Sequence, residues 1–273
     1  MTGEGIRVSS EWLDLREPAD AAARAPDLVE HLRRRLPATG RRLIHDLGCG
    51  TGAMGRWLAP LLPGPQHWVV HDRDADLLRA AAAHPPAAAA DGATVGVETQ
   101  LSDITRLPPD ELGGASLIAA SALLDLMTRD QLAGLADACA RAGCPVLLTL
   151  SVVGRVDLAP AHPLDRRVAA AFDAHQRRLT VGGRLLGPDA VPAAVEEFRR
   201  LGAEVLVRPS PWRLGAGQAG LAAEWLAGWI GAACEQQAEL AAEADAYARR
   251  RLAQARAGQL AVTVGHADLL VMP

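Results

Sequence analysis

Short apolar runs alternate with segments of helical periodicity through the middle of the chain. The apolar runs lie at 43–46, 66–72, 94–101, 115–120 and 145–150, and they predict five strand–helix alternations between residues 42 and 153. Farther along, the pattern predicts a helix over 192–201, a strand over 203–207, a broken helical pair over 218–257 and a last strand over 259–271. Alternation of this kind is typical of a mainly parallel sheet with helices on both faces.

Two segments depart from this alternation. Residues 9–36 have helical periodicity, and Pro18 and Pro26 predict that they form at least two separate helices. Residues 154–187 are rich in Arg, His and Pro and directly follow the fifth strand. Because ligands of open α/β sheets bind outside the carboxyl ends of the strands, we expect this second segment to face a substrate.

Composition narrows the class of protein. The chain has 273 residues, of which 49% are hydrophobic, so it can form one large α/β domain. Its formal charge is −4, all 28 basic residues are arginines, and they form no dense run, which argues against a nucleic-acid partner. The four cysteines show neither Cys-x-x-Cys pairing nor zinc spacing, so we expect a reducing compartment and no metal. Met1–Ser10 lacks the apolar core of a signal peptide and the apolar runs are short, so we expect a cytoplasmic protein without a membrane partner.

The first apolar run ends in the most informative stretch of the chain. Asp46 is followed by glycines at every second position, Gly48, Gly50 and Gly52, and then by an amphipathic segment over 54–62. This order predicts a strand, a sharp turn and a helix, with glycines that permit positive φ and leave no Cβ near a ligand. The spacing is not Gly-x-Gly-x-x-Gly, and no Gly-Lys-Ser/Thr follows. An acid two positions before the first glycine of the turn fits a ligand that presents a cation there.

The segment Asp46-Leu47-Gly48-Cys49-Gly50-Thr51-Gly52 closely resembles the first signature motif of class I S-adenosylmethionine-dependent methyltransferases. The resemblance implies a Rossmann-like, mainly parallel seven-stranded sheet whose final strand is antiparallel. It also implies S-adenosylmethionine as the cofactor and S-adenosylhomocysteine as the product. A glycine-rich turn with a purely structural role is the alternative at this motif.

Later residues match the family at the expected distances. Asp72 ends the second predicted strand, where the family's acid accepts hydrogen bonds from the ribose, whereas we assign Asp74 to a helix cap over 75–83. Asp103 follows the third strand at the position that receives the adenine amino group; its alternative is a solvated loop residue. The cofactor site implied by the resemblance comprises Asp46, Gly48, Cys49, Gly50, Gly52, Asp72, Arg73, Asp103, Ile104 and Ser121.

The family's fourth motif falls at 121–127, beyond the fourth strand. Enzymes that methylate exocyclic amines of bases usually carry Asn/Asp-Pro-Pro-Tyr/Phe there, and this chain does not, which argues against a nucleic-acid acceptor. Asp125 is a candidate base or a group that orients the acceptor, and a helix cap is its alternative. His175, spaced with Val168 and Phe172 on one predicted helix face, is the second candidate base. A hydrogen-bonded structural histidine is the alternative for His175.

Candidate substrate-binding residues lie outside the motifs. The density of arginines over 154–187 favours an anionic acceptor. The segment 208–214 is stiffened by two prolines and could hold the Trp212 indole and the Arg213 guanidinium over a planar aromatic acceptor. A solvated helix face would explain the arginines equally well. The candidates for the acceptor site are Arg16, on a predicted N-terminal lid, together with Arg155, Gln176, Trp212 and Arg213.

These observations predict a methyltransferase of a bacterial branch that acts on small molecules, as a monomer or homodimer. We expect direct displacement of the methyl group by an O or N atom of a metabolite or natural product. Two alternatives stay open: a non-catalytic S-adenosylmethionine-binding scaffold, and an aminopropyl-type transferase on the same fold. The predicted parts are a helical N-terminal extension or lid (1–40), a cofactor-binding core (41–153), a substrate-facing insertion (154–187) and the second half of the sheet with a helical pair (188–273).

Overall fold

The computed structural model describes residues 8–36, 39–108 and 110–273. The first seven residues of the predicted N-terminal extension, and most of the segment used to judge a signal peptide, therefore lie outside the described residues. In the part that is described, no helix is long and apolar enough to cross a bilayer. The same residues include no group of three or more His, Cys, Asp or Glu side chains arranged to hold a metal ion.

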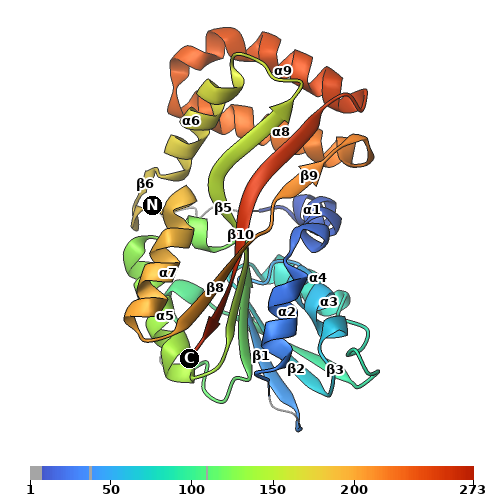
Figure 1. The fold of residues 1–273 in the computed structure, drawn as a ribbon, viewed down its shortest axis with the longest axis vertical. Coiled ribbons are helices and arrows are strands. Elements are labelled where there is room, and N and C mark those ends of the chain that lie inside the picture. Colours follow the sequence, from blue (N-terminus) through green and yellow to red (C-terminus); the bar gives the residue numbers. More distant parts are fainter. Residues whose placement is uncertain (1–7, 37–38, 109) are drawn as a thin grey trace.

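One twisted sheet runs through the molecule in the strand order β3-β2-β1-β4-β5-β10-β8 (Figure 1). The strands are β1 (Arg42–Leu47), β2 (Gln66–Asp72), β3 (Val95–Leu101), β4 (Leu117–Ser121), β5 (Val146–Ala159), β8 (Glu204–Pro209), β9 (Trp212–Leu214) and β10 (Ala261–Met272). The first five are parallel, and β10 is antiparallel to both of its neighbours. The predicted Rossmann-like fold and its antiparallel last strand are therefore confirmed, and β9 adds a short eighth strand alongside β10.

Side chains on the two faces of the sheet pack into two separate apolar clusters. In β4, Leu117 and Ala119 pack with α2 (Pro26–Arg33), α3 (Ala53–Leu58) and α4 (Ala75–Ala83), whereas Ile118 and Ala120 pack with α5 (Arg129–Ala142) and α7 (Ala190–Arg200). Side chains alternate across a strand, so a continuous apolar run supplies both faces of a buried sheet. Short 3-10 turns join the elements: η1 (Ala59–Leu61), η2 (Ile104–Arg106), η3 (Leu124–Leu126), η4 (Gly187–Asp189), η5 (Ala216–Gln218) and η6 (Ala238–Leu240).

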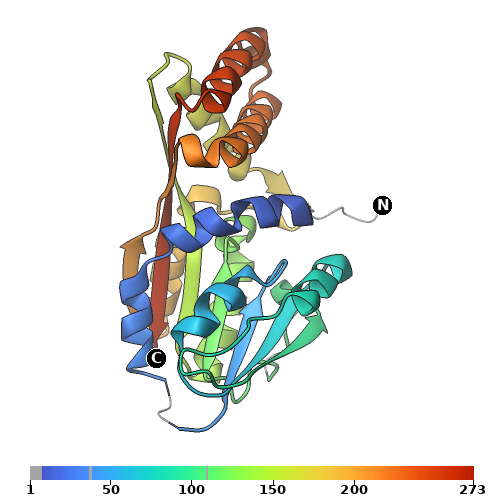
Figure 2. The ribbon, with the colours of Figure 1, turned by 90° about the vertical axis from the view of Figure 1, so that its right-hand side faces the viewer.

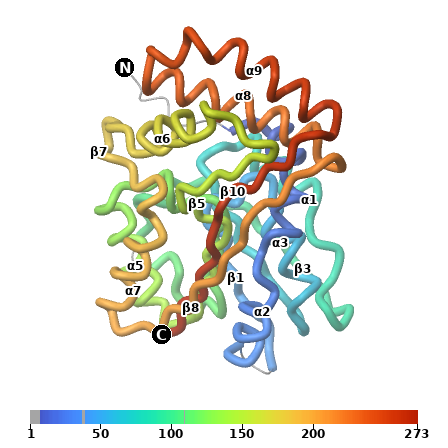
Figure 3. The backbone as a smooth tube through the Cα atoms, turned by 45° about the horizontal axis from the view of Figure 1, so that its top comes forward, coloured from blue at the N-terminus to red at the C-terminus, as the bar shows by residue number. Residues whose placement is uncertain are grey.

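Strands β5 and β10 continue beyond the sheet as a two-stranded ribbon that carries a helical cap. The ribbon pairs Val152 with His266 and Ala159 with Ala261. Three helices pack on it: α6 (Asp165–Gln176), α8 (Ala219–Gln236) and α9 (Ala241–Arg256), with α8 and α9 side by side above the strands (Figures 1 and 3). The cap has its own apolar cluster, which includes Leu158 of β5 and Tyr247 of α9. A small hairpin of β6 (Leu179–Thr180) and β7 (Gly183–Arg184) follows α6.

The cap corrects two of the predicted boundaries. The fifth strand does not end at residue 150 but runs to Ala159, so residues 154–159 belong to the ribbon rather than to an insertion. The predicted unit 188–273 is also divided, because α7 and β8 pack on the sheet while α8 and α9 pack on the cap. The extension alternates exposed and more buried positions, and Gly154, with φ +70°, interrupts the pattern that would have indicated a strand.

The N-terminal segment forms two helices, and the break between them differs from the prediction at Pro18. Helix α1 (Ser10–Ala23) runs through Pro18, and the break falls at Arg24 and Ala25, before Pro26 opens α2. Pro18 is exposed, so water can solvate the carbonyl that the proline leaves without an intrahelical donor. Packing of the opposite face, where Trp12 meets Trp212 at a centroid distance of 6.4 Å, holds the helix together.

Candidate active site

The glycine turn between β1 and α3 is sterically committed to glycine. Gly48, Gly50 and Gly52 have φ angles of +68°, +55° and +86°, in the left-handed region that side chains disfavour. A Cβ on Gly50 would lie 2.9 Å from a methyl group of Leu13 in α1, and one on Gly48 would lie 3.2 Å from a methyl group of Leu123. The turn therefore packs directly against α1 and against the loop that follows β4.

Asp46 is buried in β1 without a hydrogen-bond partner. The residue is 1% exposed, and neither carboxylate oxygen is bonded within the described part of the chain. Burial raises the pKa of Asp46 to about 7, although the positive charge of Arg24 opposes this rise. An unsatisfied buried carboxylate is costly unless a ligand supplies a donor or a positive charge. The residue thus fits the predicted role of meeting the cationic end of S-adenosylmethionine.

Asp72 ties the glycine turn to the end of β2. Its Oδ2 accepts a hydrogen bond from Gly50 N at 2.9 Å, and its Oδ1 accepts one from Asp74 N at 3.0 Å. The carboxylate is half-buried and keeps acceptor capacity for further donors, as a ribose diol requires. Asp74 caps α4 by accepting a hydrogen bond from Asp76 N, which confirms the assignment of Asp74 to a helix cap.

The remaining cofactor candidates surround this turn. Asp103 accepts hydrogen bonds from the backbone and hydroxyl of Thr105 at 3.0 and 2.7 Å and is exposed at the start of η2. A Cβ on Gly48 would lie 3.8 Å from Ile104 Cδ1, so Ile104 flanks the turn. Arg73 is exposed on the loop after Asp72.

Cys49 is a buried structural thiol within the turn. Burial raises its pKa, and its backbone N donates to His71 O at 2.9 Å. A protonated, enclosed thiol is a poor nucleophile, so this cysteine shapes the turn rather than taking part in chemistry.

Helix α1 crosses the carboxyl edge of the parallel strands (Figure 2). Glu17 forms a two-pronged ion pair with Arg56 of α3, with N–O distances of 2.8 and 2.5 Å. Asp20 accepts hydrogen bonds from both Arg16 and the indole of Trp212. These contacts place the helix over the candidate site, in the position of a lid.

Trp212 does not present the free stacking face that we predicted for a substrate. The residue is 2% exposed, its Nε1 donates to Asp20 Oδ1 at 2.9 Å, and the Arg16 guanidinium lies 4.9 Å from the ring centroid. Trp12 and His266 contact the same indole. The prolines on either side of Ser210 interrupt the edge strand between β8 and β9, and the tryptophan that follows packs inward against α1.

The two candidate bases have different surroundings. Asp125 is half-buried in η3, and burial raises its pKa while the charges of Arg16 and Arg178 oppose the rise. His175 lies on the cap, where its Nε2 is 3.2 Å from Glu235 of α8 and its backbone oxygen accepts from Arg178. The charge of Arg16 on α1 thus acts on Asp125, whereas His175 has the surroundings of a structural residue.

The other substrate candidates are spread over the cap. Arg155 is exposed on the ribbon and pairs with Asp157 at 2.7 Å, and Arg213 is exposed on β9. Gln176, at the end of α6, packs closely against Gly187. None of these three side chains has a described contact with the glycine turn.

Sequence reasoning missed the residues that join distant elements at this edge. Arg24 donates to Ser121 Oγ and Thr149 Oγ1, and Asp268 accepts from the backbone N atoms of Ala25 and Leu150. Leu150 has φ +58°, and Ala122 beyond β4 has φ +52°, conformations that non-glycine residues adopt at a cost and that gather at functional sites. No local motif marks these positions.

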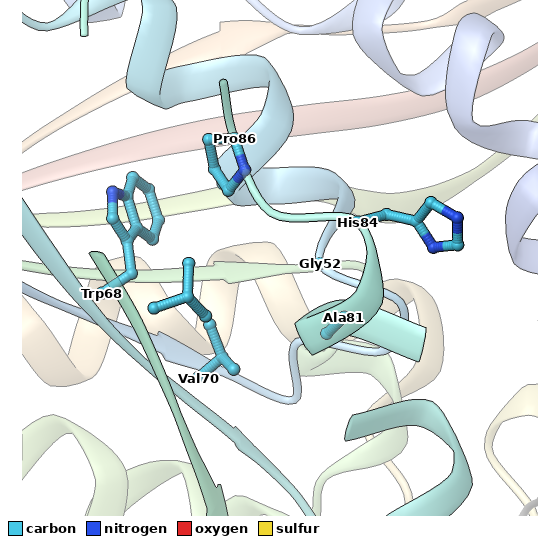
Figure 4. Close-up of a pocket in the computed structure, with 8 residues that line it drawn as sticks. Gly52, Trp68, Val70, Ala81, His84 and Pro86 are labelled. Carbon is cyan, nitrogen blue, oxygen red and sulfur yellow. The ribbon is translucent and has the colours of Figure 1, made fainter. Parts of the chain in front are cut away.

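Two hollows lie near the turn. The smaller, about 10 Å³, holds no more than one water and lies between β2, α3 and α4, lined by Trp68, Val70 and Ala81 among others (Figure 4). The larger, about 390 Å³, opens between Val8–Glu11 at the start of α1 and the first turns of α4. Asp74 lines the larger hollow, which therefore opens beside the loop that Asp72 begins.

The chain is similar to one protein family and to several solved structures. Residues 44–145 match the family described as methyltransferase domain. Among solved structures, the chain is similar to the cyclopropane synthase MmaA2 from Mycobacterium tuberculosis, with 14% identity, a TM-score of 0.49 and coverage of 97% of this chain and 94% of that one. It is also similar to a SAM-dependent methyltransferase from Thiobacillus denitrificans in complex with S-adenosyl-L-homocysteine, with 15% identity, a TM-score of 0.47 and coverage of 98% and 99%. The comparison with curated proteins found no match.

The strand order, the glycine turn and the acid at the end of β2 define the class: the protein has the Rossmann-like fold of the class I methyltransferases. Residues 44–145 match the methyltransferase-domain family, in agreement with the resemblance to S-adenosylmethionine-dependent methyltransferases that the motifs carry.

Proposed function

We propose that the protein transfers a methyl group from S-adenosylmethionine to an O or N atom of a small-molecule acceptor. The observation that carries this proposal is Asp46, a buried carboxylate without a hydrogen-bond partner among the described residues, two positions before the first of three glycines with positive φ. The cofactor's sulfonium supplies an electrophilic methyl group when it is bound. The protein then has to hold the cofactor, align the acceptor and exclude water.

Different residues around the turn bind different parts of the cofactor. Asp46 meets the cationic methionine end, and Asp72, which already accepts a hydrogen bond from Gly50 N, holds the ribose. Asp103 and Ile104 lie on the next loop, where they would bound the adenine.

The acceptor side lies between α1, η3 and the turn after α6. Asp125 is the preferred base, since burial raises its pKa even though the charges of Arg16 and Arg178 oppose the rise. A carboxyl group with a raised pKa is better suited to take a proton than an ordinary one. Its two arginine neighbours favour an acceptor that carries an anionic or polar group. Helix α1 covers this edge and would keep water from the reacting atoms (Figure 2).

We also propose that the protein is bacterial and cytoplasmic, acting as a monomer or homodimer without a nucleic-acid or membrane partner. Support against a nucleic-acid partner comes from the scattered arginines and the formal charge of −4. The cysteines at positions 49, 139, 144 and 234 are all free thiols, as expected in a reducing compartment.

A turnover experiment tests this function. The purified chain is incubated with S-adenosylmethionine and fractions of a bacterial metabolite extract, and S-adenosylhomocysteine is measured by mass spectrometry. We expect acceptor-dependent formation of S-adenosylhomocysteine by the wild type and by Asp130→Asn, a change at an exposed acid of α5, but not by Asp125→Asn. A protein that binds S-adenosylhomocysteine yet forms none with any fraction would contradict an enzymatic role.

A further inference from the structure

Arg24 lies between α1 and α2, and only some of the donors of its buried guanidinium form hydrogen bonds within the described chain. The residue is 3% exposed. Its Nη2 donates to Ser121 Oγ at 3.1 Å, and its Nε donates to Thr149 Oγ1 at 3.4 Å. Its Nη1 has no acceptor among the residues that the structure describes. A buried cationic nitrogen with unused donors is costly, and it indicates a place where an anionic group binds.

The position of Arg24 relates it to the glycine turn. Ser121 is the last residue of β4, and its register partner in β5 is Thr149. The preceding residue of β4, Ala120, pairs with Leu47 of β1. The guanidinium therefore lies at the carboxyl edge of the sheet, one step beyond the point where β1 passes into the turn.

Arg24 and Asp46 influence each other without forming a hydrogen bond. Burial lowers the pKa of Arg24, and the charges of Asp20, Asp268 and Asp46, in that order, oppose the change. Burial raises the pKa of Asp46, and Arg24 is the charge that opposes this rise most. Yet Nη1 of Arg24 and both carboxylate oxygens of Asp46 are without partners in the described chain. Two buried opposite charges that do not pair with each other are complementary to a ligand end that carries both charges.

We propose that Arg24 binds the α-carboxylate of the cofactor while Asp46 meets its α-ammonium. This inference rests on the proposed use of S-adenosylmethionine. Nη1 carries two N–H donors, which suits a carboxylate oxygen, and hydrogen bonds between ionised groups are the stronger kind. The arrangement makes the site selective for a cofactor that keeps its carboxylate. It therefore opposes aminopropyl transfer, which uses the decarboxylated cofactor.

Contacts of the neighbouring backbone and of a tryptophan ring hold Arg24 in position. Ala25 N donates to Asp268 Oδ2 at 2.8 Å, so the junction between the two helices is tied to β10. The Trp57 ring lies 5.0 Å from the guanidinium carbon and limits the orientation of the group. Recognition of the cofactor's amino-acid end thus belongs to the N-terminal extension as well as to the glycine turn.

Calorimetric titration with three compounds tests the proposal. S-adenosylhomocysteine carries both charges, its decarboxylated analogue keeps only the ammonium, and 5′-methylthioadenosine lacks the amino-acid end. For the wild type we expect S-adenosylhomocysteine to bind about 10- to 100-fold more tightly than the decarboxylated analogue, the range for one charge-assisted contact. Arg24→Gln should bring this ratio close to one and leave 5′-methylthioadenosine affinity unchanged. Arg35→Gln, at an exposed arginine after α2, should keep the wild-type ratio.

The possible outcomes separate this inference from the proposed function. An unchanged ratio in Arg24→Gln would overturn the role of Arg24, and binding of 5′-methylthioadenosine shows that the variant is folded. If Arg24→Gln does not fold, the wild type decides, because equal affinity for S-adenosylhomocysteine and its decarboxylated analogue would overturn the proposal. A wild type that binds none of the three compounds would instead contradict the use of this cofactor.

Discussion

Two buried charges, Asp46 and Arg24, give the carboxyl edge of the sheet its chemical character. Each has polar atoms without a partner in the described chain: Asp46 lies near the end of β1, and Arg24 donates to the residues that pair at the end of β4. Ordinary core residues do not leave charges in this state, because an unpaired buried charge destabilises the fold. The cost indicates that these side chains are kept for binding rather than for stability.

The raised pKa of Asp46 predicts a pH dependence of cofactor binding. The ammonium of S-adenosylhomocysteine favours the ionised carboxylate, so the affinity should rise from about pH 5.5 through the pKa of about 7 and level off above about pH 8, where Asp46 is ionised in the free protein as well. Asp46→Asn should bind more weakly at neutral pH and show no such rise. Calorimetry across this range measures the effect; an equal rise in both proteins would assign the titration to another group.

The raised pKa of Asp46 also predicts that the protein without its cofactor becomes less stable as the pH rises, whereas cofactor affinity increases. The pKa of Asp46 is raised from 3.8 to about 7, so the folded state holds this proton more tightly than the unfolded state does. The stabilisation is fully present below 3.8 and is lost as the pH rises through about 7. Asp46→Asn should therefore unfold at a higher urea concentration than the wild type at about pH 8.

Sequence patterns indicate the residues whose role follows from the local chain. Asp46, the glycines and Asp74 are recognised because strand, turn and helix cap are neighbours in sequence. Arg24 and Trp212 act through partners about a hundred residues or more away, Ser121 and Asp20 respectively. Periodicity carries no information about such contacts, so Arg24 was missed and Trp212 was assigned to a substrate.

Helix α1 is the element that closes the site. It is fastened to α3 through Glu17 and Arg56, and to β9 through Asp20 and Trp212. Its end is fastened to β10, where Asp268 accepts a hydrogen bond from Ala25 N. A lone helix of this length is marginal in water, so these contacts rather than intrinsic propensity keep α1 in place.

Among the residues that connect distant elements, we expect Asp268 to contribute most to the free energy of unfolding. Its carboxylate accepts hydrogen bonds from Ala25 N, Leu150 N and the Ser210 hydroxyl at 2.8, 2.8 and 2.5 Å. Asp268→Ala leaves these buried donors unsatisfied and should lower the free energy of unfolding by about 3 kcal/mol. Urea denaturation measures the change, with Asp245→Ala at an exposed position of α9 as the control. Equal midpoints for the two variants would show that Asp268 does not join these elements.

The elements themselves were largely predictable, and the failure at β5 has a physical reason. Its first half is buried on both faces and forms a continuous apolar run, which indicates a strand. Its second half leaves the sheet and is stabilised by β10, more than a hundred residues later. Arg155 and Asp157 on the exposed side of the ribbon have the composition of a loop.

The whole molecule consists of a cofactor-binding sheet and a helical cap joined by the β5–β10 ribbon (Figures 1 and 2). The sheet contains two apolar clusters and the cap contains a third. The fold class was predictable because the Rossmann-like alternation and the motif order are local signals. The cap was not, because its helices, α6, α8 and α9, come from two separate parts of the chain and meet only in three dimensions.

A buried ion pair within the cap predicts that the two parts can be loosened separately. Arg251 donates to both Asp165 oxygens at 2.5 and 2.6 Å, and the Tyr247 hydroxyl donates to the same carboxylate at 2.6 Å. Arg251→Met breaks the link between α6 and α9 at a cost of about 3–5 kcal/mol. Hydrogen exchange should accelerate in these two helices but not in β1 to β4, with unchanged S-adenosylhomocysteine affinity. Arg256→Met is the exposed control; faster exchange throughout the sheet would contradict a separable cap.

Binding of S-adenosylhomocysteine to the wild type and to Asp72→Ala tests the central claim most directly. Titration calorimetry should give one site per chain for the wild type. Asp72→Ala should bind at least about tenfold more weakly, because the ribose loses its acceptor while the sheet stays folded by circular dichroism. A wild type that shows no saturable binding, or an Asp72→Ala variant with unchanged affinity, would contradict the assignment of this edge as the cofactor site.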